Sequence, residues 1–182
     1  MEATPRKEVF TPVVTVAKEG DIQEISNLIN LTYSGYSGKK GWTTEADLLS
    51  GQKVTPKAIG EILSNPNKKI LVSRGNKLLL GCVFLEKRDK SIYLSALTVN
   101  PNFQRKNIGS KLLSSSETFS SLFWKIYNIE MTVLNQRHEL LEWYKKRGYK
   151  DFGLRLPFPY WNKEMGIPKI GGLEFVVLTK FF

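Results

Sequence analysis

Apolar positions follow two periods along the chain, and each period predicts one kind of element. Short apolar runs bounded by turn-forming residues are typical of strands, whereas apolar positions three and four residues apart indicate helices. By this criterion we expect strands at 13–16, 69–73, 78–87, 91–99, 129–134, 149–156 and 173–179. The turn-like segments 74–76 and 88–90 separate three of these runs and favour an antiparallel meander.

Helix signals lie between the predicted strands. Asp21 with Glu24 three residues later is typical of a helix start, and Thr55 followed by Pro56 is another. The other helices are expected from Thr44, after Gly109 and over 139–146. The resulting order, β-α-α-α-β-β-β-α-β-α-β-β, predicts an α/β (α+β) protein whose mixed sheet carries helices on both faces.

Length and hydropathy favour one domain. With 182 residues, 41% of them hydrophobic, the chain is long enough for a single core, which we expect over 12–182. The polar segment 1–11 is expected to be a flexible tail and lacks the apolar run of a signal peptide. No stretch approaches the length of a membrane span. A soluble, cytoplasmic protein is therefore expected, and a nuclear location is compatible.

Charge and cysteine usage narrow the chemistry. The chain has 27 lysines and arginines against 17 acidic residues, a net charge of +10. This excess favours a polyanionic partner such as a nucleotide, a nucleic acid or an acidic membrane, without choosing among them. Cys82, the only cysteine, lies in an apolar run, which indicates a buried thiol rather than a nucleophile. His138, the only histidine, is interpreted as an exposed helix residue, and no metal site is expected.

Segment 97–110 carries the most specific candidate chemistry. An apolar, strand-like run breaks at Pro101, passes through a basic loop of small and amide residues, and enters a long helix. Backbone N–H groups at such a helix start can hold an anion, so the segment predicts a phosphate site. Taken alone, a solvated basic turn is an equal interpretation.

Two segments together resemble the GNAT N-acetyltransferase superfamily. Residues 104–109 are similar to its pyrophosphate loop, Gln/Arg-x-x-Gly-x-Gly/Ala, with Asn107 in place of the first glycine. Asparagine is the ordinary residue best able to adopt a left-handed backbone. Residues 143–149 resemble the family's helix in which a tyrosine precedes a Gly-aromatic pair. The family's asparagine seven positions before Tyr144 is Arg137 here, with Asn135 two residues earlier.

The resemblance implies a fold, a cofactor and a reaction. It implies a mostly antiparallel central sheet of about seven strands, acetyl-CoA as co-substrate, no metal, and direct transfer of an acetyl group to an amine. Tyr144 would donate toward the CoA sulfur; the alternative is a core tyrosine, since Leu140 and Leu141 place it on the apolar helix face. The implied cofactor-binding residues are Leu97, Thr98, Val99, Gln104, Arg105, Lys106, Asn107, Ile108, Gly109, Ser110, Asn135 and Arg137.

The acceptor side is less clearly marked. Glu45 is the candidate general base or substrate anchor, and its alternative is an acid in the first turn of a helix, where it complements the dipole. Deprotonation relayed by water, with no dedicated base, also fits. The candidate substrate-binding residues are Tyr33, Trp42, Thr44 and Tyr93.

We therefore expect an acetyl-CoA-dependent N-acetyltransferase that acts on a primary amine of a small molecule or peptide. Two other functions fit parts of the sequence: a GNAT-fold protein that binds acetyl-CoA without transfer, and a basic nucleic-acid-binding module. The scattered positions of the lysines and arginines argue against the second. No membrane partner is expected, and the apolar residues Phe181 and Phe182 are compatible with a homodimer.

Overall fold

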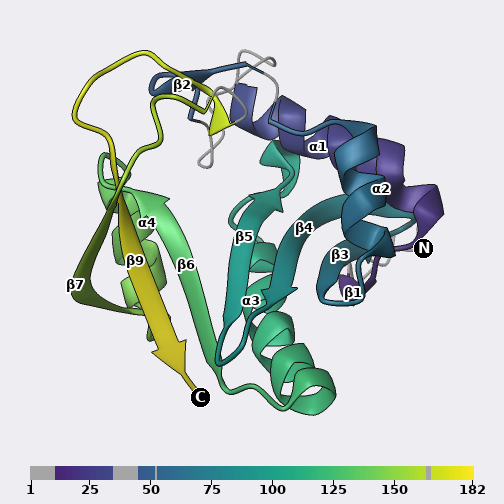
Figure 1. The fold of residues 1–182 in the computed structure, drawn as a ribbon. Coiled ribbons are helices and arrows are strands. Elements are labelled where there is room, and N and C mark those ends of the chain that lie inside the picture. The colour runs from purple at the N-terminus through teal and green to yellow at the C-terminus, as the bar shows by residue number, and fades with distance from the viewer. Residues whose placement is uncertain (1–10, 35–44, 52, 163–164) are drawn as a thin grey trace, which may run out of the picture.

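The computed structural model describes residues 11–34, 45–51, 53–162 and 165–182, and its main feature is a seven-stranded sheet (Figure 1). The strands lie in the order β1-β3-β4-β5-β6-β9-β7, and neighbours are antiparallel except for β5 and β6. Their bounds are Val13–Val16 (β1), Lys68–Gly75 (β3), Leu78–Lys87 (β4), Ile92–Val99 (β5), Asn128–Leu134 (β6), Lys150–Pro157 (β7) and Glu174–Phe181 (β9). A separate antiparallel pair is formed by Leu49–Ser50 (β2) and Ile167–Pro168 (β8).

Helices cover both faces of this sheet. The helices α1 (Ile22–Ser34) and α2 (Pro56–Ser64) pack on one face of the β3–β5 half. On the opposite face, α3 (Ile108–Phe119) packs on the same strands and α4 (His138–Lys145) packs on β6 and β9 (Figure 1). The predicted class, a mixed and mostly antiparallel sheet of about seven strands with helices on both faces, is confirmed. No helix in the described ranges is both long and apolar enough to cross a membrane.

Alternation along the central strands builds a core on each face. Ile70 and Val72 of β3 pack with residues of α1 and α2, whereas Leu71 between them packs with residues of α3. All three are at most 3% exposed. Full burial of a side chain of this size contributes about 1.5–3 kcal/mol relative to exposure. The apolar run of β3 is therefore nearly continuous because the strand is covered on both sides.

The helix predicted from Thr44 is not present in the described residues that follow it. Residues 46–48 form a turn, and β2 comes directly after it. Leu49 of β2 packs with residues of the β6 end and of the 158–173 segment, far along the chain. The prediction was wrong because this long-range packing leaves no local signal. Thr44 itself lies outside the described residues, as does the predicted tail 1–11 apart from its last residue.

The sheet opens between β5 and β6. These strands pair only at Ile92 with Ile129 and at Tyr93 with Glu130, beyond which they diverge (Figure 1). Just past this point Ala96 adopts a left-handed backbone, with φ of 49°, and the register of β5 against β4 shifts. A residue with a Cβ rarely adopts this conformation, so the bulge is a strained feature that the surrounding sheet maintains.

Candidate functional site

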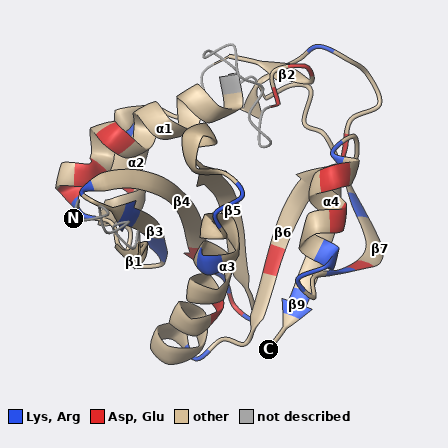
Figure 2. Ribbon diagram, turned by 180° about the vertical axis from the view of Figure 1, so that it is seen from behind, with Lys and Arg blue, Asp and Glu red and all other residues tan. Residues whose placement is uncertain are grey.

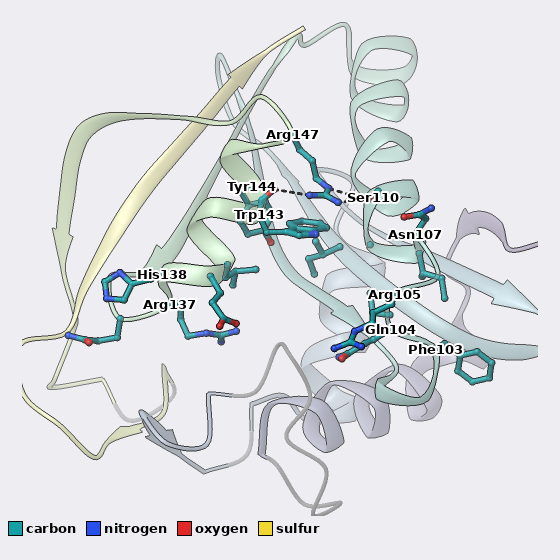
Figure 3. A pocket seen from close by; sticks show the side chains of 17 residues that line it. Phe103, Gln104, Arg105, Asn107, Ser110, Arg137, His138, Trp143, Tyr144 and Arg147 are labelled. Atoms are coloured by element: carbon teal, nitrogen blue, oxygen red, sulfur yellow. Dashed lines mark hydrogen bonds between the residues drawn. The ribbon is translucent and has the colours of Figure 1, made fainter.

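Two cavities meet between β5, β6 and α4. The larger, of about 870 Å³, is lined by the end of β5, the loop after it, the start of α3 and one face of α4 (Figure 3). The smaller, of about 60 Å³, lies where β5 and β6 diverge. Leu97, Arg137, Leu140 and Tyr144 line both cavities, so these four side chains form the junction between them.

The loop between β5 and α3 has the backbone form of an anion cradle. Arg105 and Asn107 are both left-handed, with φ of 62° and 59°, and Lys106 between them is not. Alternation of this kind turns successive N–H groups toward one concave side. Asn107 directly precedes α3, whose first N–H groups lack intrahelical partners and carry the positive end of the helix dipole. Asn107 thus has the left-handed conformation expected of a residue that replaces glycine.

Gly109 brings the start of α3 close to α4. A Cβ at this position would lie 3.4 Å from Cζ2 of Trp143 and 3.5 Å from Cγ2 of Val99, which are ordinary contact distances. The position therefore has room for a methyl group, whereas a longer side chain would enter the cavity or press on Trp143. Val99 also lines the larger cavity, as do the predicted loop residues Gln104, Arg105, Asn107, Ile108, Gly109 and Ser110.

Arg147 joins the two helices that flank the larger cavity. Its Nε and one terminal nitrogen donate to the Ser110 hydroxyl at 3.0 and 2.9 Å, and the other donates to the Trp143 carbonyl at 2.9 Å (Figure 3). The guanidinium also stacks 3.7 Å from the centre of the Trp143 ring. A guanidinium is always charged and is rigid once it is stacked and hydrogen-bonded. Arg147 therefore holds a fixed positive charge beside the start of α3.

Tyr144 stands at the junction of the cavities. The residue is 5% exposed, and its ring packs edge-on against Trp143 and Tyr149, with centres 5.0 and 5.8 Å apart. Burial raises the pKa of its phenol well above the ordinary value; the Arg137 and Arg147 cations lower it and the Glu45 carboxylate raises it. The hydroxyl is therefore protonated at neutral pH and available as a donor. The core and catalytic interpretations of Tyr144 are compatible, because the ring is in the core and the residue lines both cavities.

Glu45 lies in the smaller cavity between two cations. Its Oε2 is 2.6 Å from Nζ of Lys53, and its Oε1 is 4.0 Å from a terminal nitrogen of Arg137. The Glu45 N–H donates to the carbonyl of Tyr33, whose ring also lines this cavity. Residues 46–48 form a turn rather than a helix, so the alternative in which Glu45 complements a helix dipole does not apply to the described residues.

Three predicted cofactor residues do not line the cavities. The Asn135 amide donates to the Gly172 carbonyl at 3.1 Å and accepts from the Glu174 N–H at 3.3 Å, so it ties β6 to the start of β9. Thr98 is fully buried and donates to the carbonyl of Ala96, because strand alternation turns its side chain away from Leu97 and Val99. Lys106 extends its ammonium over the Phe103 ring instead.

Of the four predicted substrate-binding residues, the structure describes two, and these two are placed differently. Tyr33 lines the smaller cavity, whereas the Tyr93 hydroxyl is held 2.6 Å from the Thr132 hydroxyl and its ring lies under Arg88. Tyr93 therefore borders the smaller cavity through Thr132, which lines it. Trp42 and Thr44 lie outside the described residues.

Sequence reasoning missed most of the α4 face that lines the larger cavity. The residues it did not assign to a site are Phe103, Gln136, His138, Glu139, Leu140, Trp143 and Arg147. A signal was present, because residues three and four apart lie on one helix face and positions 140, 143, 144 and 147 have this spacing. The exposed position expected for His138 is observed, and it lies at the first position of α4.

Cys82 offers no nucleophile. The residue is fully buried, and burial raises the pKa of its thiol to about 12, although a side-chain hydrogen bond with Thr98 acts in the lowering direction. The thiolate is the reactive form, so this thiol is inert at neutral pH. Within the described parts of the chain, no group of three or more His, Cys, Asp or Glu side chains is placed to hold a metal ion.

Solved structures with the same architecture include three N-acetyltransferases. The enzyme from Staphylococcus aureus Mu50 is 13% identical with a TM-score of 0.71, and the match covers 94% of this chain and 97% of that one. PaiA from Thermoplasma acidophilum, solved in complex with coenzyme A, is 17% identical with a TM-score of 0.68 and coverage of 94% and 99%. The spermidine/spermine enzyme SpeG from Vibrio cholerae, solved with manganese ions, is 15% identical with a TM-score of 0.65 and coverage of 93% and 92%. The TM-scores establish a shared fold, and at sequence identities this low the likeness shows the fold alone.

Sequence comparison identifies the family. No curated protein matches the chain. The family described as Acetyltransferase (GNAT) domain matches residues 43–157, which is more than half of the chain and includes the β5–α3 loop and α4. The cradle at the start of α3, the opened sheet and the buried tyrosine at the junction all lie within this match, and the chain belongs to the GNAT acetyltransferase family.

Proposed function

We propose that the protein transfers an acetyl group from acetyl-CoA to a primary amine of a small molecule or peptide. The observation that carries the proposal is the position of Tyr144, a protonated hydroxyl donor at the junction of a large cavity and a small one. A donor at this point can serve a thioester that reaches it from one side and an amine that reaches it from the other.

The larger cavity fits coenzyme A. The N–H groups of the left-handed loop and of the α3 start would hold the diphosphate, and Arg105 and Arg147 supply positive charge beside them. Leu97 and Val99 offer backbone groups and an apolar wall to the pantetheine arm, which can lie along β5 like an added strand. The bound cofactor would supply the activated acyl group.

Tyr144 is assigned as a hydrogen-bond donor to the leaving sulfur. A free tyrosine has a pKa of about 10 and a thiol about 8.5, so full proton transfer to thiolate is uphill by about 2 kcal/mol. Burial raises the pKa of Tyr144 further and makes full transfer still less favourable. A preorganised donor that stabilises developing negative charge needs no full transfer. The Ala96 bulge supports a second electrostatic contribution to catalysis, from backbone N–H groups that polarise the thioester carbonyl. The bulge leaves Leu97 at the junction of the cavities, with its backbone outside the regular β4–β5 register.

Direct attack of the amine on the thioester is favoured over a covalent acetyl-enzyme, because Cys82 is buried and protonated. Glu45 is close enough to the junction to hold the acceptor or to take its proton. Accepting a proton would break its ion pair with Lys53, which favours the role of anchor over that of general base.

Two other functions remain as outcomes of the test. A protein that only binds acetyl-CoA would share the larger cavity, and its cofactor site would look the same. A nucleic-acid-binding module is not favoured, because lysines and arginines are spread over many elements of the described chain rather than gathered on one face (Figure 2).

The test is a thiol-release assay with acetyl-CoA and a panel of amines, amino acids and peptides, run beside calorimetric titration of CoA. Release that depends on the amine, together with CoA binding, is expected. Binding without release for every amine would contradict transfer and favour the binding protein. Absence of CoA binding would contradict the assignment of the larger cavity.

A further inference from the structure

The smaller cavity carries an unusual charge balance for an amine site. Among the described residues that line it, Glu45 is the one acidic side chain and Arg137 the one basic side chain. Lys53 then adds a second cation 2.6 Å from the Glu45 carboxylate. The three side chains are 16%, 13% and 23% exposed, so water screens them only in part. Taken together, these three described side chains carry one positive charge in excess.

This excess disfavours an acceptor that brings several ammonium groups. Glu45 already faces two cations, so a second ammonium on the acceptor would meet more positive than negative charge. The attacking amine itself gains from the same balance, because nearby positive charge favours the neutral, nucleophilic form of an amine.

The excess favours an acceptor with negative charge near its amino group. A cavity of about 60 Å³ accommodates the amine end of an acceptor but little more, so the neighbouring groups would lie at its edge. Lys53 is the most exposed of the three side chains, and its Nζ lies 5.4 Å from the centre of the Tyr33 ring that forms part of the wall. A carboxylate beside the amine would therefore come under the combined field of Lys53 and Arg137.

We infer that the acceptor is an amine with an adjacent carboxylate, of the amino-acid class, rather than a polyamine. The inference rests on the proposed acetyl transfer, and it assigns Lys53 and Arg137 as the side chains that select for the carboxylate. Glu45 holds Lys53 in place and limits the excess of positive charge to one unit. Glu45 is therefore a positioning residue for acceptor specificity.

The test compares acceptors that differ only in the carboxylate. L-methionine and L-methioninamide form one pair, and spermidine represents the polyamines; thiol release is measured over a pH series and kcat/KM is expressed per neutral amine, because the carboxylate of methionine raises the pKa of its α-amine above that of the amide. The ratio of kcat/KM for the acid to that for the amide is expected to be about tenfold, with spermidine below both. A ratio near one, or preference for spermidine, would overturn the inference while leaving acetyl transfer intact.

Substitutions of lysine test whether Lys53 causes the preference for the carboxylate. Lys53→Gln is expected to bring the acid-to-amide ratio close to one, and Lys53→Arg to retain most of it. Lys57→Gln is the matched control, since it removes the same charge from α2 at a side chain that is 88% exposed, and should leave the ratio unchanged. Thermal melting confirms that each variant is folded. An unchanged ratio in Lys53→Gln would overturn the role of Lys53.

A binding measurement separates this inference from the proposed function. Methionine and methioninamide are titrated calorimetrically into the protein saturated with CoA. Tighter binding of methionine that Lys53→Gln abolishes, without any thiol release, would contradict transfer and support the charge selection. Equal or absent binding of both compounds, together with a ratio near one in turnover, would contradict the charge selection.

Discussion

The two cavities that meet at Tyr144 are built from different parts of the molecule and from different kinds of atom. Among the described residues, the larger is lined by the segments 97–110 and 136–147, and its candidate anion cradle is made of backbone N–H groups. The smaller is lined by side chains from α1, the turn after residue 44, β5, β6 and α4. A backbone cradle depends on local conformation, whereas a cluster of charged side chains depends on how distant segments pack.

The difference has a chemical consequence. A cradle of N–H groups binds any phosphate that reaches it and tolerates side-chain changes that preserve φ, as Asn107 shows with its left-handed backbone. The acceptor selection that we infer for Glu45, Lys53 and Arg137 would change with a single substitution, because each charge is a large fraction of the balance. Under the proposed function, the larger cavity is therefore suited to binding the cofactor and the smaller to selecting the acceptor.

Tyr144 belongs to both cavities, and its removal is expected to have the largest effect. Tyr144→Phe keeps the ring in the core and removes the donor, so kcat should fall by about 10²–10³-fold. Acetyl-CoA affinity should change by less than about threefold, because the cradle is untouched. Steady-state thiol release and calorimetry measure the two quantities. Turnover close to that of the parent protein would refute the role of the hydroxyl.

Gly109 tests the larger cavity alone. Gly109→Leu places a side chain against Trp143 or into the cavity and should weaken acetyl-CoA binding about tenfold or more. Gly109→Ala is the control, because a Cβ there meets only ordinary contacts and should leave binding nearly unchanged. Calorimetry with CoA compares the three proteins. Equal affinities would show that the start of α3 does not approach the cofactor.

Arg147 tests whether the charge beside the cradle acts on phosphate. Arg147→Met should weaken acetyl-CoA binding about fivefold at low salt and less at high salt, because salt screens exposed charges. Acetyl-pantetheine, which lacks the diphosphate, should react equally well with both proteins. Lys145→Met removes the same charge from α4 outside the cavity and serves as control. Equal losses with both thioesters would indicate that Arg147 acts through its contacts with Ser110 and Trp143.

Asn107 tests how far the cradle depends on backbone alone. Asn107→Gly should keep CoA affinity within about twofold, because glycine adopts the same left-handed conformation freely. Asn107→Val should lower the free energy of unfolding by about 1–2 kcal/mol and weaken CoA, since a β-branched residue is strained at φ of 59°. Denaturant unfolding and calorimetry provide the readouts. Loss of CoA binding in Asn107→Gly would show that the asparagine side chain takes part.

The pH dependence of turnover is expected to show the smallest effect. The pKa of Tyr144 is raised, so its protonated form persists as pH rises and is lost only above the ordinary tyrosine value of about 10. The kcat should therefore not decline between pH 8 and about pH 9.5, a range in which thiol release remains measurable. A decline in this range that Tyr144→Phe removes would mean that the phenol titrates lower than its burial implies.

Much of the larger cavity could be predicted because its signals are local. Periodicity indicated β5, α3 and α4, the loop residues indicated an anion site, and the resemblance to the GNAT family, which includes the Tyr144 to Gly148 spacing, related the two segments. The exceptions have physical reasons. The Thr98 side chain turns inward because of strand alternation, whereas the contact predicted for residues 97–99 is one of backbone groups and stays a prediction. Asn135 is held by the backbone at the start of β9, a contact that neighbouring residues in the sequence do not predict.

The smaller cavity was predicted only as a set of candidate side chains. Glu45 was expected in a helix, and its partner Lys53 was not considered, because their contact depends on the turn that leads into β2. The pairing of β2 with β8 is equally long-range. Such contacts depend on which distant segments pack together, and the local pattern of one sequence does not predict this packing.

The sequence by itself determined the alternation of strands and helices, the candidate anion loop before α3, and the family to which the chain belongs. Only the tertiary structure decided that β5 and β6 diverge after Tyr93, that Tyr144 joins two cavities, and that Glu45 faces two cations. The physical reason is the sequence separation between the residues that interact. Backbone conformation and amphipathic period are properties of neighbouring residues, whereas the charge balance of a cavity is the sum over side chains that meet only after the chain has folded.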